Sequence, residues 1–272
     1  MPSFADKVVL ITGTARGCGT VLADAFANAG ATVVGCDVDA EAGKSAADKI
    51  RAAGGRIDFS PADVSREQDV EALIAGTLDA HGRLDCAINN AGTEELSEIA
   101  DATESAFDEL IATDLKGLFF CLKHEINAMR ANGGGAILNM SSVTSSITAA
   151  PANGLYAATK GGVNGLTKAA AIEVGSHNIS VNALAFAAID IPGCMIWRYL
   201  EEQQVPEEVL MQAFPVGRMG RPEELVAAAM YLCSDDARFL HRYDTRPRRG
   251  IHRPVVTRHP RSRHPRRRPH SD

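Results

Sequence analysis

The 272-residue sequence contains no apolar run of the roughly 18 residues that a helix needs to cross a bilayer. Its first strand-like segment starts at Lys7, which leaves no room for a signal peptide. The six cysteines are scattered and include no Cys-x-x-Cys pair, so neither a disulfide framework nor a zinc site is expected. The sequence therefore predicts a cytoplasmic globular protein with reduced thiols and without a bound metal.

Charge is distributed unevenly along the chain. Residues 1–237 carry 16 basic and 32 acidic side chains, a net charge of −16. From Arg238 onward there are 12 arginines, five histidines and five prolines, with only two acids. An acidic body does not favour nucleic acid or an anionic membrane as a partner. The basic tail leaves one alternative open, a nucleic-acid-binding arm.

The body alternates short β-rich runs with longer helical patterns. Apolar strands that alternate with helices predict a single α/β domain with a doubly wound parallel sheet, whose ligands bind at the carboxyl ends of the strands. The expected strands are Val8–Thr12, Thr32–Asp37, Arg56–Ser60, Leu84–Asn89, Ala136–Met140 and Ser180–Ala185. The expected helices include Thr20–Ala29, Ala40–Ala53, Arg66–His81, Ser105–Asn132 and Leu155–His177.

A glycine-rich turn follows the first expected strand and precedes a helix. Such a turn lets the backbone approach a pyrophosphate, whose charge faces the N–H groups of the helix N-terminus. Asp37 ends the second expected strand, 18 residues after Gly19. A carboxylate there accepts from a ribose 2′-hydroxyl and repels a 2′-phosphate, which favours NAD over NADP. The candidate residues of the turn are Gly13, Arg16, Gly17, Cys18 and Gly19.

The glycine spacing, G-x-x-x-G-x-G, resembles that of the classical short-chain dehydrogenase/reductase family, and three further motifs carry the same resemblance in order along the chain. They are Asp63-Val64, the turn Asn89-Asn90-Ala91-Gly92, and Tyr156-x-x-x-Lys160. The resemblance implies a Rossmann fold over residues 1–239 and a dinucleotide held in part by Asp63, Val64, Asn90, Ala91, Gly92, Tyr156 and Lys160.

Tyr156 and Lys160 lie one helical turn apart, so both project from the same face. A neighbouring ammonium and a positive nicotinamide should lower the pKa of the phenol from its usual value of about 10. The resemblance makes Tyr156 the general acid/base, Lys160 the residue that holds the ribose, and Ser142 the residue that polarises the substrate carbonyl. Ser141, Thr144 and Ser145 are alternatives to Ser142.

Two positions depart from the family pattern. Asp114 stands where the family usually has an Asn that sustains a water relay; its charge should oppose phenolate formation or pair with Lys160, unless it is a near-neutral replacement. After the sixth strand, Phe186 and Ala187 replace Pro-Gly, and Ile191 stands where a Thr commonly contacts the nicotinamide carboxamide. Backbone groups near Ile189 are then expected to hold the carboxamide.

The segment after the sixth strand is rich in large apolar residues, including Met195, Trp197, Tyr199 and Phe214. We expect this segment to be the lid of an apolar pocket, which predicts a mostly apolar ketone or secondary alcohol as substrate. The alternative is that these residues make ordinary core or oligomer contacts. A 3-oxoacyl-carrier-protein reductase, which usually prefers NADPH, and a catalytically weak dinucleotide-binding protein are the other functions considered.

Residues 240–272 do not match the family, whose last strand and part of whose subunit interface come from this region. Their arginine, histidine and proline content cannot build a buried strand. When His241 to Pro254 is back-translated with GC-rich codons and the result is translated in the frame one base later, it can produce an ending close to that of the family. We therefore interpret the tail as the product of a frameshift near Phe239, with the final strand absent or altered. The family's homotetramer is in doubt for the same reason.

Overall fold

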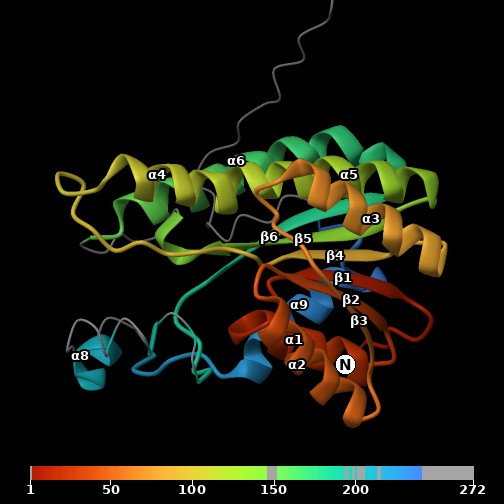
Figure 1. The fold of residues 1–272 in the computed structure, drawn as a ribbon, viewed down its shortest axis with the longest axis horizontal. Helices are drawn as coiled ribbons and strands as arrows, with labels where there is room; N and C mark the ends of the chain where they lie inside the picture. Colours follow the sequence, from red (N-terminus) through yellow and green to blue (C-terminus); the bar gives the residue numbers. More distant parts are fainter. Residues whose placement is uncertain are drawn as a thin grey trace, which may run out of the picture.

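The computed structural model describes residues 2–145, 152–192, 194, 196–197, 200, 206–212 and 216–240. A six-stranded, fully parallel sheet runs through the centre of these residues in the order β3-β2-β1-β4-β5-β6 (Figure 1). Its strands are β1 (Val8–Thr12), β2 (Thr32–Asp37), β3 (Arg56–Pro61), β4 (Cys86–Asn89), β5 (Gly135–Ser142) and β6 (Ile179–Phe186). The predicted doubly wound, single-domain α/β fold is confirmed.

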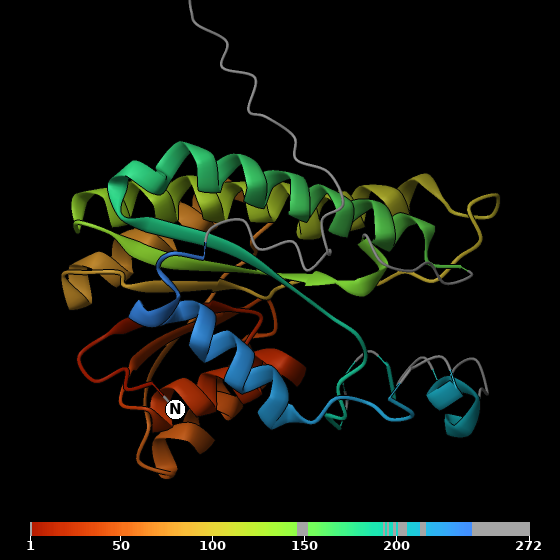
Figure 2. The same cartoon turned by 180° about the vertical axis from the view of Figure 1, so that it is seen from behind.

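Helices cover both faces of the sheet (Figures 1 and 2). One layer holds α1 (Gly17–Asn28), α2 (Ala40–Ala52) and α9 (Pro222–Cys233), and the opposite layer holds α3 (Glu67–His81), α5 (Leu118–Ala131) and α6 (Gly154–Val174). Two hydrophobic clusters lie between the sheet and these helix layers, one on each face of the sheet. Along β1, Val9 and Ile11 belong to one cluster while Val8 and Leu10 belong to the other. Burial on both faces explains why the strands are apolar without alternation.

The long helix expected over Ser105–Asn132 is three elements in the structure. An α-helical segment, α4 (Glu104–Leu110), passes into a π-helical segment, η1 (Ile111–Gly117), and then into α5. The expected helix Leu155–His177 likewise ends as α6 followed by a 3₁₀ turn, η3 (Gly175–His177). The sequence pattern did not reveal the π-turn, because hydrophobic periodicity does not distinguish one inserted residue from a small phase error.

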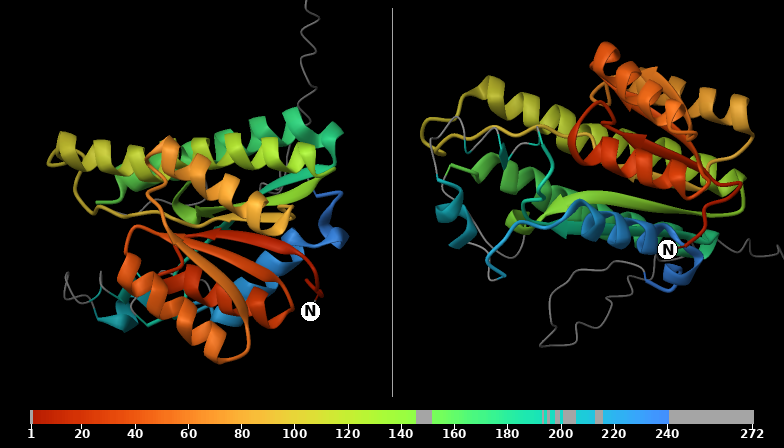
Figure 3. Two further views of the ribbon diagram at one scale, coloured as in Figure 1. Left: turned by 45° about the vertical axis from the view of Figure 1, so that its right-hand side comes forward. Right: turned by 90° about the horizontal axis from the view of Figure 1, so that it is seen from below.

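Two 3₁₀ turns and one short helix are also found among the described residues. The 3₁₀ turn η2 (Val143–Ser145) follows β5, and η4 (Asp235–Ala237) follows α9. The short helix α8 (Glu207–Gln212) lies beyond the carboxyl ends of the strands (Figure 3). No helix in the described part of the chain is long and apolar enough to cross a membrane.

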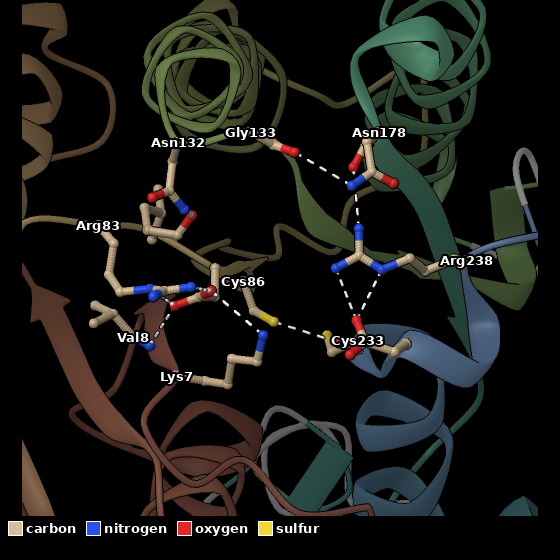
Figure 4. Close-up of polar contacts among 12 residues, drawn as sticks. Lys7, Val8, Arg83, Cys86, Asn132, Gly133, Asn178, Cys233 and Arg238 are labelled. Carbon is tan, nitrogen blue, oxygen red and sulfur yellow. Dashed lines mark hydrogen bonds and ion pairs between the residues drawn. The ribbon is translucent and has the colours of Figure 1, made fainter.

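Charged contacts tie the sheet together at its amino end. The Asp85 carboxylate accepts from the Val8 backbone N–H at 2.9 Å and from Arg83 Nε at 2.8 Å, and Lys7 Nζ lies 3.6 Å away (Figure 4). Because Val8 starts β1 and Asp85 precedes β4, this carboxylate joins two neighbouring strands. Asp85 is buried, so its charge requires these partners.

The end of the described chain is fixed near the start of β6. Arg238 donates to the carbonyl oxygen of Asn178 at 3.2 Å and to Asp235 at 2.8 Å (Figure 4). In the described sheet β6 is the outermost strand and pairs only with β5. The aberrant tail and the altered final strand predicted from the sequence lie beyond Leu240, outside the described residues, so the domain boundary at residue 239 stays a prediction.

Candidate active site

The predicted site residues gather at the carboxyl ends of β1, β2, β4 and β5. The glycine turn leaves β1, Asp37 ends β2, the Asn89 turn follows β4, and Ser142 ends β5. The strand order reverses between β1 and β4. In doubly wound sheets, ligands bind in the crevice that forms at such a point, beyond the carboxyl ends of the strands. The topology therefore brings residues far apart in the sequence to one place.

The glycine turn is closely packed against the turn that follows β4. A Cβ on Gly19 would lie 1.8 Å from the carbonyl oxygen of Gly13, and a Cβ on Gly13 would lie 2.9 Å from Asn90 Nδ2. Gly13 and Gly17 have positive φ angles of 74° and 62°, which favour glycine. Above Gly17 the nearest atom to such a Cβ is Cys194 Cβ at 3.9 Å. Gly13 and Gly19 therefore leave no room for a side chain, whereas the space beside Gly17 is open.

The N-terminus of α1 is suited to a pyrophosphate. Its N-cap residue, Arg16, makes no side-chain capping bond, and its first turn holds no acid. The first N–H groups of a helix have no intrahelical acceptor and carry partial positive charge. The cradle of glycines and this uncapped helix end therefore fit the dinucleotide that the sequence predicts. Burial raises the pKa of the Cys18 thiol to about 11, so Cys18 contributes its backbone rather than a thiolate.

Two acids lie beside the turn that precedes α1. Asp37 accepts from the Ala15 N–H at 2.9 Å and from the Asp39 N–H at 3.1 Å. An ionised carboxylate has about four lone-pair positions, so Asp37 can still accept from a hydroxyl. Arg16, a cation that a 2′-phosphate would attract, is paired with Asp39 at 2.5 Å. Asp37 and Asp39 therefore place negative charge beside the start of α1.

The turn after β4 is attached to the glycine turn. Asn90 Nδ2 donates to the carbonyl oxygens of Thr12 and Gly13 at 3.0 and 3.1 Å, and Thr12 Oγ1 accepts from the N–H groups of Asn90 and Ala91. The Asn90 side chain therefore positions the cradle instead of facing a ligand. A Cβ on Gly92 would lie 3.0 Å from Asp114 Oδ2.

The predicted adenine-side pair follows β3. Asp63 Oδ1 accepts from the Ser65 N–H at 2.9 Å, while the Asp63 N–H donates to Asp69 Oδ2. Val64 is buried against Gly117. These contacts fix the loop that would meet the adenine.

Ser142, Tyr156 and Lys160 come together at the end of β5 and the start of α6. The Ser142 side chain lies near enough to the Tyr156 hydroxyl to lower the pKa of the phenol, and Lys160 Nζ lies 5.3 Å from the centroid of the Tyr156 ring. Of the alternatives to Ser142, Ser141 donates to Asn164 and Thr144 donates to Ser142 itself. Among these candidates, Ser142 is the one whose side chain acts on the phenol of Tyr156.

The pKa of Tyr156 departs from the expectation. Burial raises the pKa of the phenol above its ordinary value of 10, and the carboxylates of Glu94 and Asp114 raise it further, while the Ser142 hydrogen bond lowers it. The expected lowering by Lys160 is not seen in the protein alone. Lys160 itself has a charged neighbour.

That neighbour is Asp114. Its Oδ2 atom lies 3.0 Å from Lys160 Nζ, both side chains are buried, and its Oδ1 accepts from the Thr93 N–H at 2.8 Å. Asp114 sits in the middle of the π-helical segment η1, a type of turn that often occurs at functional sites. Asp114 therefore pairs with Lys160 and also raises the pKa of Tyr156, so both effects considered for its charge are present in the structure.

The carboxamide end of the site is occupied by contacts within the protein. The carbonyl oxygen of Ile189 accepts from the Ile191 N–H at 2.9 Å and from Cys194 Sγ at 3.3 Å. Ile191 is buried in the hydrophobic cluster that includes residues of α1 and α9. Met195, Tyr199 and Phe214 of the predicted lid lie outside the described residues.

Sequence reasoning missed Glu94. It accepts from Asn153 Nδ2 at 3.1 Å, and its charge acts on Tyr156. No motif marked it, because it lies in an irregular loop and reaches the site only through the fold.

Comparisons with known proteins agree with this geometry. A family model described as enoyl-(acyl carrier protein) reductase matches residues 13–242. The chain is 34% identical to a 2,5-dichloro-2,5-cyclohexadiene-1,4-diol dehydrogenase of Sphingobium indicum, over 88% of this chain and 94% of that protein. The crystal structure of levodione reductase superposes with a TM-score of 0.82 at 34% identity and covers 88% of this chain and 95% of its own.

A crystal structure of NAD⁺-bound xylitol dehydrogenase superposes with a TM-score of 0.84 at 26% identity, over 89% of this chain and 97% of its own. The glycine turn, the tyrosine–lysine pair and these similarities agree over most of the chain. The chain belongs to the classical short-chain dehydrogenase/reductase family of oxidoreductases.

Proposed function

We propose that this protein is an NAD(H)-dependent oxidoreductase that interconverts a mostly apolar secondary alcohol and its ketone. The observation that carries the proposal is the convergence of three side chains, with Ser142 acting on the phenol of Tyr156 and the Lys160 ammonium 5.3 Å from the centre of its ring. A hydroxyl pair of this kind binds one carbonyl or alcohol oxygen from two sides. The nicotinamide, when bound, accepts or supplies the hydride.

Each residue has a separate task in this mechanism. Ser142 donates to the substrate oxygen and orients it, and Tyr156 exchanges a proton with that oxygen. Lys160 holds the ribose and contributes positive charge beside the phenol. The N-terminus of α1 binds the pyrophosphate, Asp37 accepts from the ribose, and Asp63 with Val64 borders the adenine. Backbone groups around Ile189 border the carboxamide.

NAD is preferred over NADP in this proposal. Support comes from Asp37 at the end of β2 and from Arg16, whose charge is already paired with Asp39. The relative with bound NAD⁺ is consistent with this choice. The six cysteines, all free thiols, are consistent with a reducing compartment such as the cytoplasm. The homo-oligomer stays a prediction, to be measured by size-exclusion chromatography with light scattering.

A second candidate function is a weakly catalytic dinucleotide-binding protein. It is favoured by the Lys160–Asp114 ion pair, which accompanies a raised pKa of Tyr156. A buried phenol that stays protonated binds a substrate oxygen but is a poor base for alcohol oxidation.

The deciding experiment titrates the purified protein with NADH and NADPH and then assays apolar ketones, secondary alcohols and a 3-oxoacyl thioester. The proposal expects tighter NADH binding and turnover that Tyr156→Phe abolishes. Tyr231→Phe, at an exposed tyrosine of α9, is the matched control and should leave turnover unchanged. NADH binding without turnover in the parent supports the second candidate, and absence of NADH binding contradicts both.

A further inference from the structure

A chain of buried side chains behind the site has a hydrogen-bond direction that the backbone fixes. The carbonyl oxygen of Val163 can only accept, so the Thr167 hydroxyl donates to it at 2.8 Å. Thr167 Oγ1 then accepts from Asn139 Nδ2 at 2.8 Å. The amide oxygen of Asn139 is therefore its other terminal atom, and it accepts from Asn89 Nδ2 at 3.0 Å.

This direction determines what Asn89 can offer to Glu125. Asn89 Nδ2 donates its second hydrogen to Glu125 Oε2 at 3.0 Å. Both amide hydrogens of Asn89 are then used, and its Oδ1 atom has no hydrogen-bond partner among the described residues. Glu125 Oε1 is likewise buried without a hydrogen-bond partner there. Two unsatisfied acceptors thus belong to two side chains that already touch.

A single proton removes both defects. On Glu125 Oε1 it would convert an acceptor into a donor for the Asn89 oxygen, while Asn89 Nδ2 continues to donate to Oε2. Amide and carboxylic acid then form a ring of two hydrogen bonds. An unmade hydrogen bond on a buried polar atom is costly, and a buried unpaired charge is costlier still, so the protonated arrangement is favoured.

We propose that Glu125 is a neutral acid paired with Asn89, and that this pair is a positioning element for the dinucleotide site. Asn89 ends β4 and immediately precedes Asn90, whose side chain holds the carbonyl oxygens of Thr12 and Gly13. If the pair is lost, we expect Asn89 to shift. The shift is passed to the glycine turn through the peptide link to Asn90 and the two hydrogen bonds that Asn90 Nδ2 donates. The positioning role rests on the proposed function; the protonation state does not.

The surroundings of Glu125 support a neutral side chain. Glu125 is fully buried, and burial raises its pKa to about 7 although the Asn89 bond lowers it. Two titratable groups that interact with Glu125 are the thiols of Cys36 on β2 and Cys121 on its own helix, whose pKa values burial raises. Both thiols are neutral near pH 7. On the side of β5 and α6, Glu125 is linked through Asn89 to the uncharged side chains of Asn139 and Thr167.

On the substrate side, the charged pair of Asp114 and Lys160 lies near Asn89. They line, together with Asn89 and Cys121, a cavity of about 10 Å³, close to the room that one water molecule needs. A water there that donates to Asn89 Oδ1 is the competing arrangement. It would satisfy Asn89 and leave Glu125 ionised.

Infrared difference spectroscopy separates the two arrangements without any cofactor or activity. Below pH 7 the parent should show the carbonyl stretching band of a neutral carboxylic acid, and Glu125→Gln should lack it. Glu173→Gln, at an exposed position of α6, is the matched control and should keep the band. A parent spectrum without a band that depends on Glu125 overturns the acid–amide pair.

The positioning role is measured by NADH titration across pH 7. Glutamine has a donor and an acceptor in place of those of a neutral carboxylic acid. Below pH 7, Glu125→Gln should therefore bind NADH with the affinity of the parent. Above pH 7, the variant should keep this affinity. Glu125→Met removes both hydrogen bonds and should weaken binding roughly three- to tenfold. Unchanged NADH affinity in a folded Glu125→Met variant overturns the positioning role. If the parent itself binds no NADH, the proposed function fails, and the infrared result still decides the pair.

Discussion

Lys160 Nζ and Asp114 Oδ2 form a buried ion pair 3.0 Å long beside the phenol of Tyr156. Asp114→Asn removes one of the charges that raise the pKa of Tyr156 and leaves the Lys160 charge uncompensated. We expect the pKa of the phenol to fall and the pH–rate profile for alcohol oxidation to move to lower pH. The measurement is kcat/KM against pH for parent and variant.

The control for this prediction is Asp108→Asn, at an exposed position of α4, which should leave the profile in place. Superimposable profiles for the parent and Asp114→Asn would show that the carboxylate does not govern the ionisation of Tyr156.

Cofactor preference should depend on Asp37 and Asp39. The double variant Asp37→Ser, Asp39→Asn removes two negative charges and releases Arg16 from its ion pair. We expect NADPH affinity to rise and NADH affinity to fall, changing their ratio by roughly tenfold or more, since an arginine–phosphate contact is a strong bidentate one. Fluorescence titration with both dinucleotides measures the ratio. Asp79→Asn on α3 is the control; an unchanged ratio in the double variant argues against recognition at this position.

The glycine turn permits a comparison of two Gly→Ala changes. In Gly19→Ala the new Cβ would clash with the Gly13 carbonyl oxygen, so NADH binding and stability should both be lost in large part. In Gly76→Ala, inside α3, a Cβ meets nothing within 4 Å, and stability should rise by about 0.5–1 kcal/mol. Thermal unfolding and NADH titration test the pair. Normal NADH binding by Gly19→Ala would mean that the turn rearranges freely.

Asp85 should make the protein sensitive to acid. Burial alone would raise its pKa, but Arg83, the Val8 N–H and Lys7 together hold the pKa below its ordinary value of 3.8. A depressed pKa adds stability above the unfolded value, and this stability is lost as the pH falls through the folded value. Asp85→Asn should lower the free energy of unfolding at neutral pH by about 1–2 kcal/mol, because Arg83 and Lys7 are partly exposed.

Denaturant titrations of the parent and Asp85→Asn at neutral and acid pH measure this difference, which should shrink below the ordinary pKa of Asp85. A difference that stays constant with pH would assign the role of Asp85 to packing instead of charge.

The sequence predicted the parallel sheet, the glycine turn, Asp37 and the Tyr156–Lys160 pair because each depends on local pattern or on the order of motifs. It also predicted that Asp114 would oppose the phenolate or pair with Lys160. It could not predict Glu94 or the Glu125–Asn89 contact. Those arise where α5 and an irregular loop pack against strands distant in the sequence, and neither residue type nor spacing encodes such contacts.

The π-turn at Ile111–Gly117 has a consequence for how this chain tolerates change. An α-helix advances about 100° per residue, so deleting one residue from the turn would restore α-helical phase and rotate α4 relative to α5 by that angle. Either Asp114 would leave Lys160 or the buried face of α5 would leave the sheet. We therefore expect this segment to be more sensitive to the loss of one codon than to a conservative substitution at one of its positions.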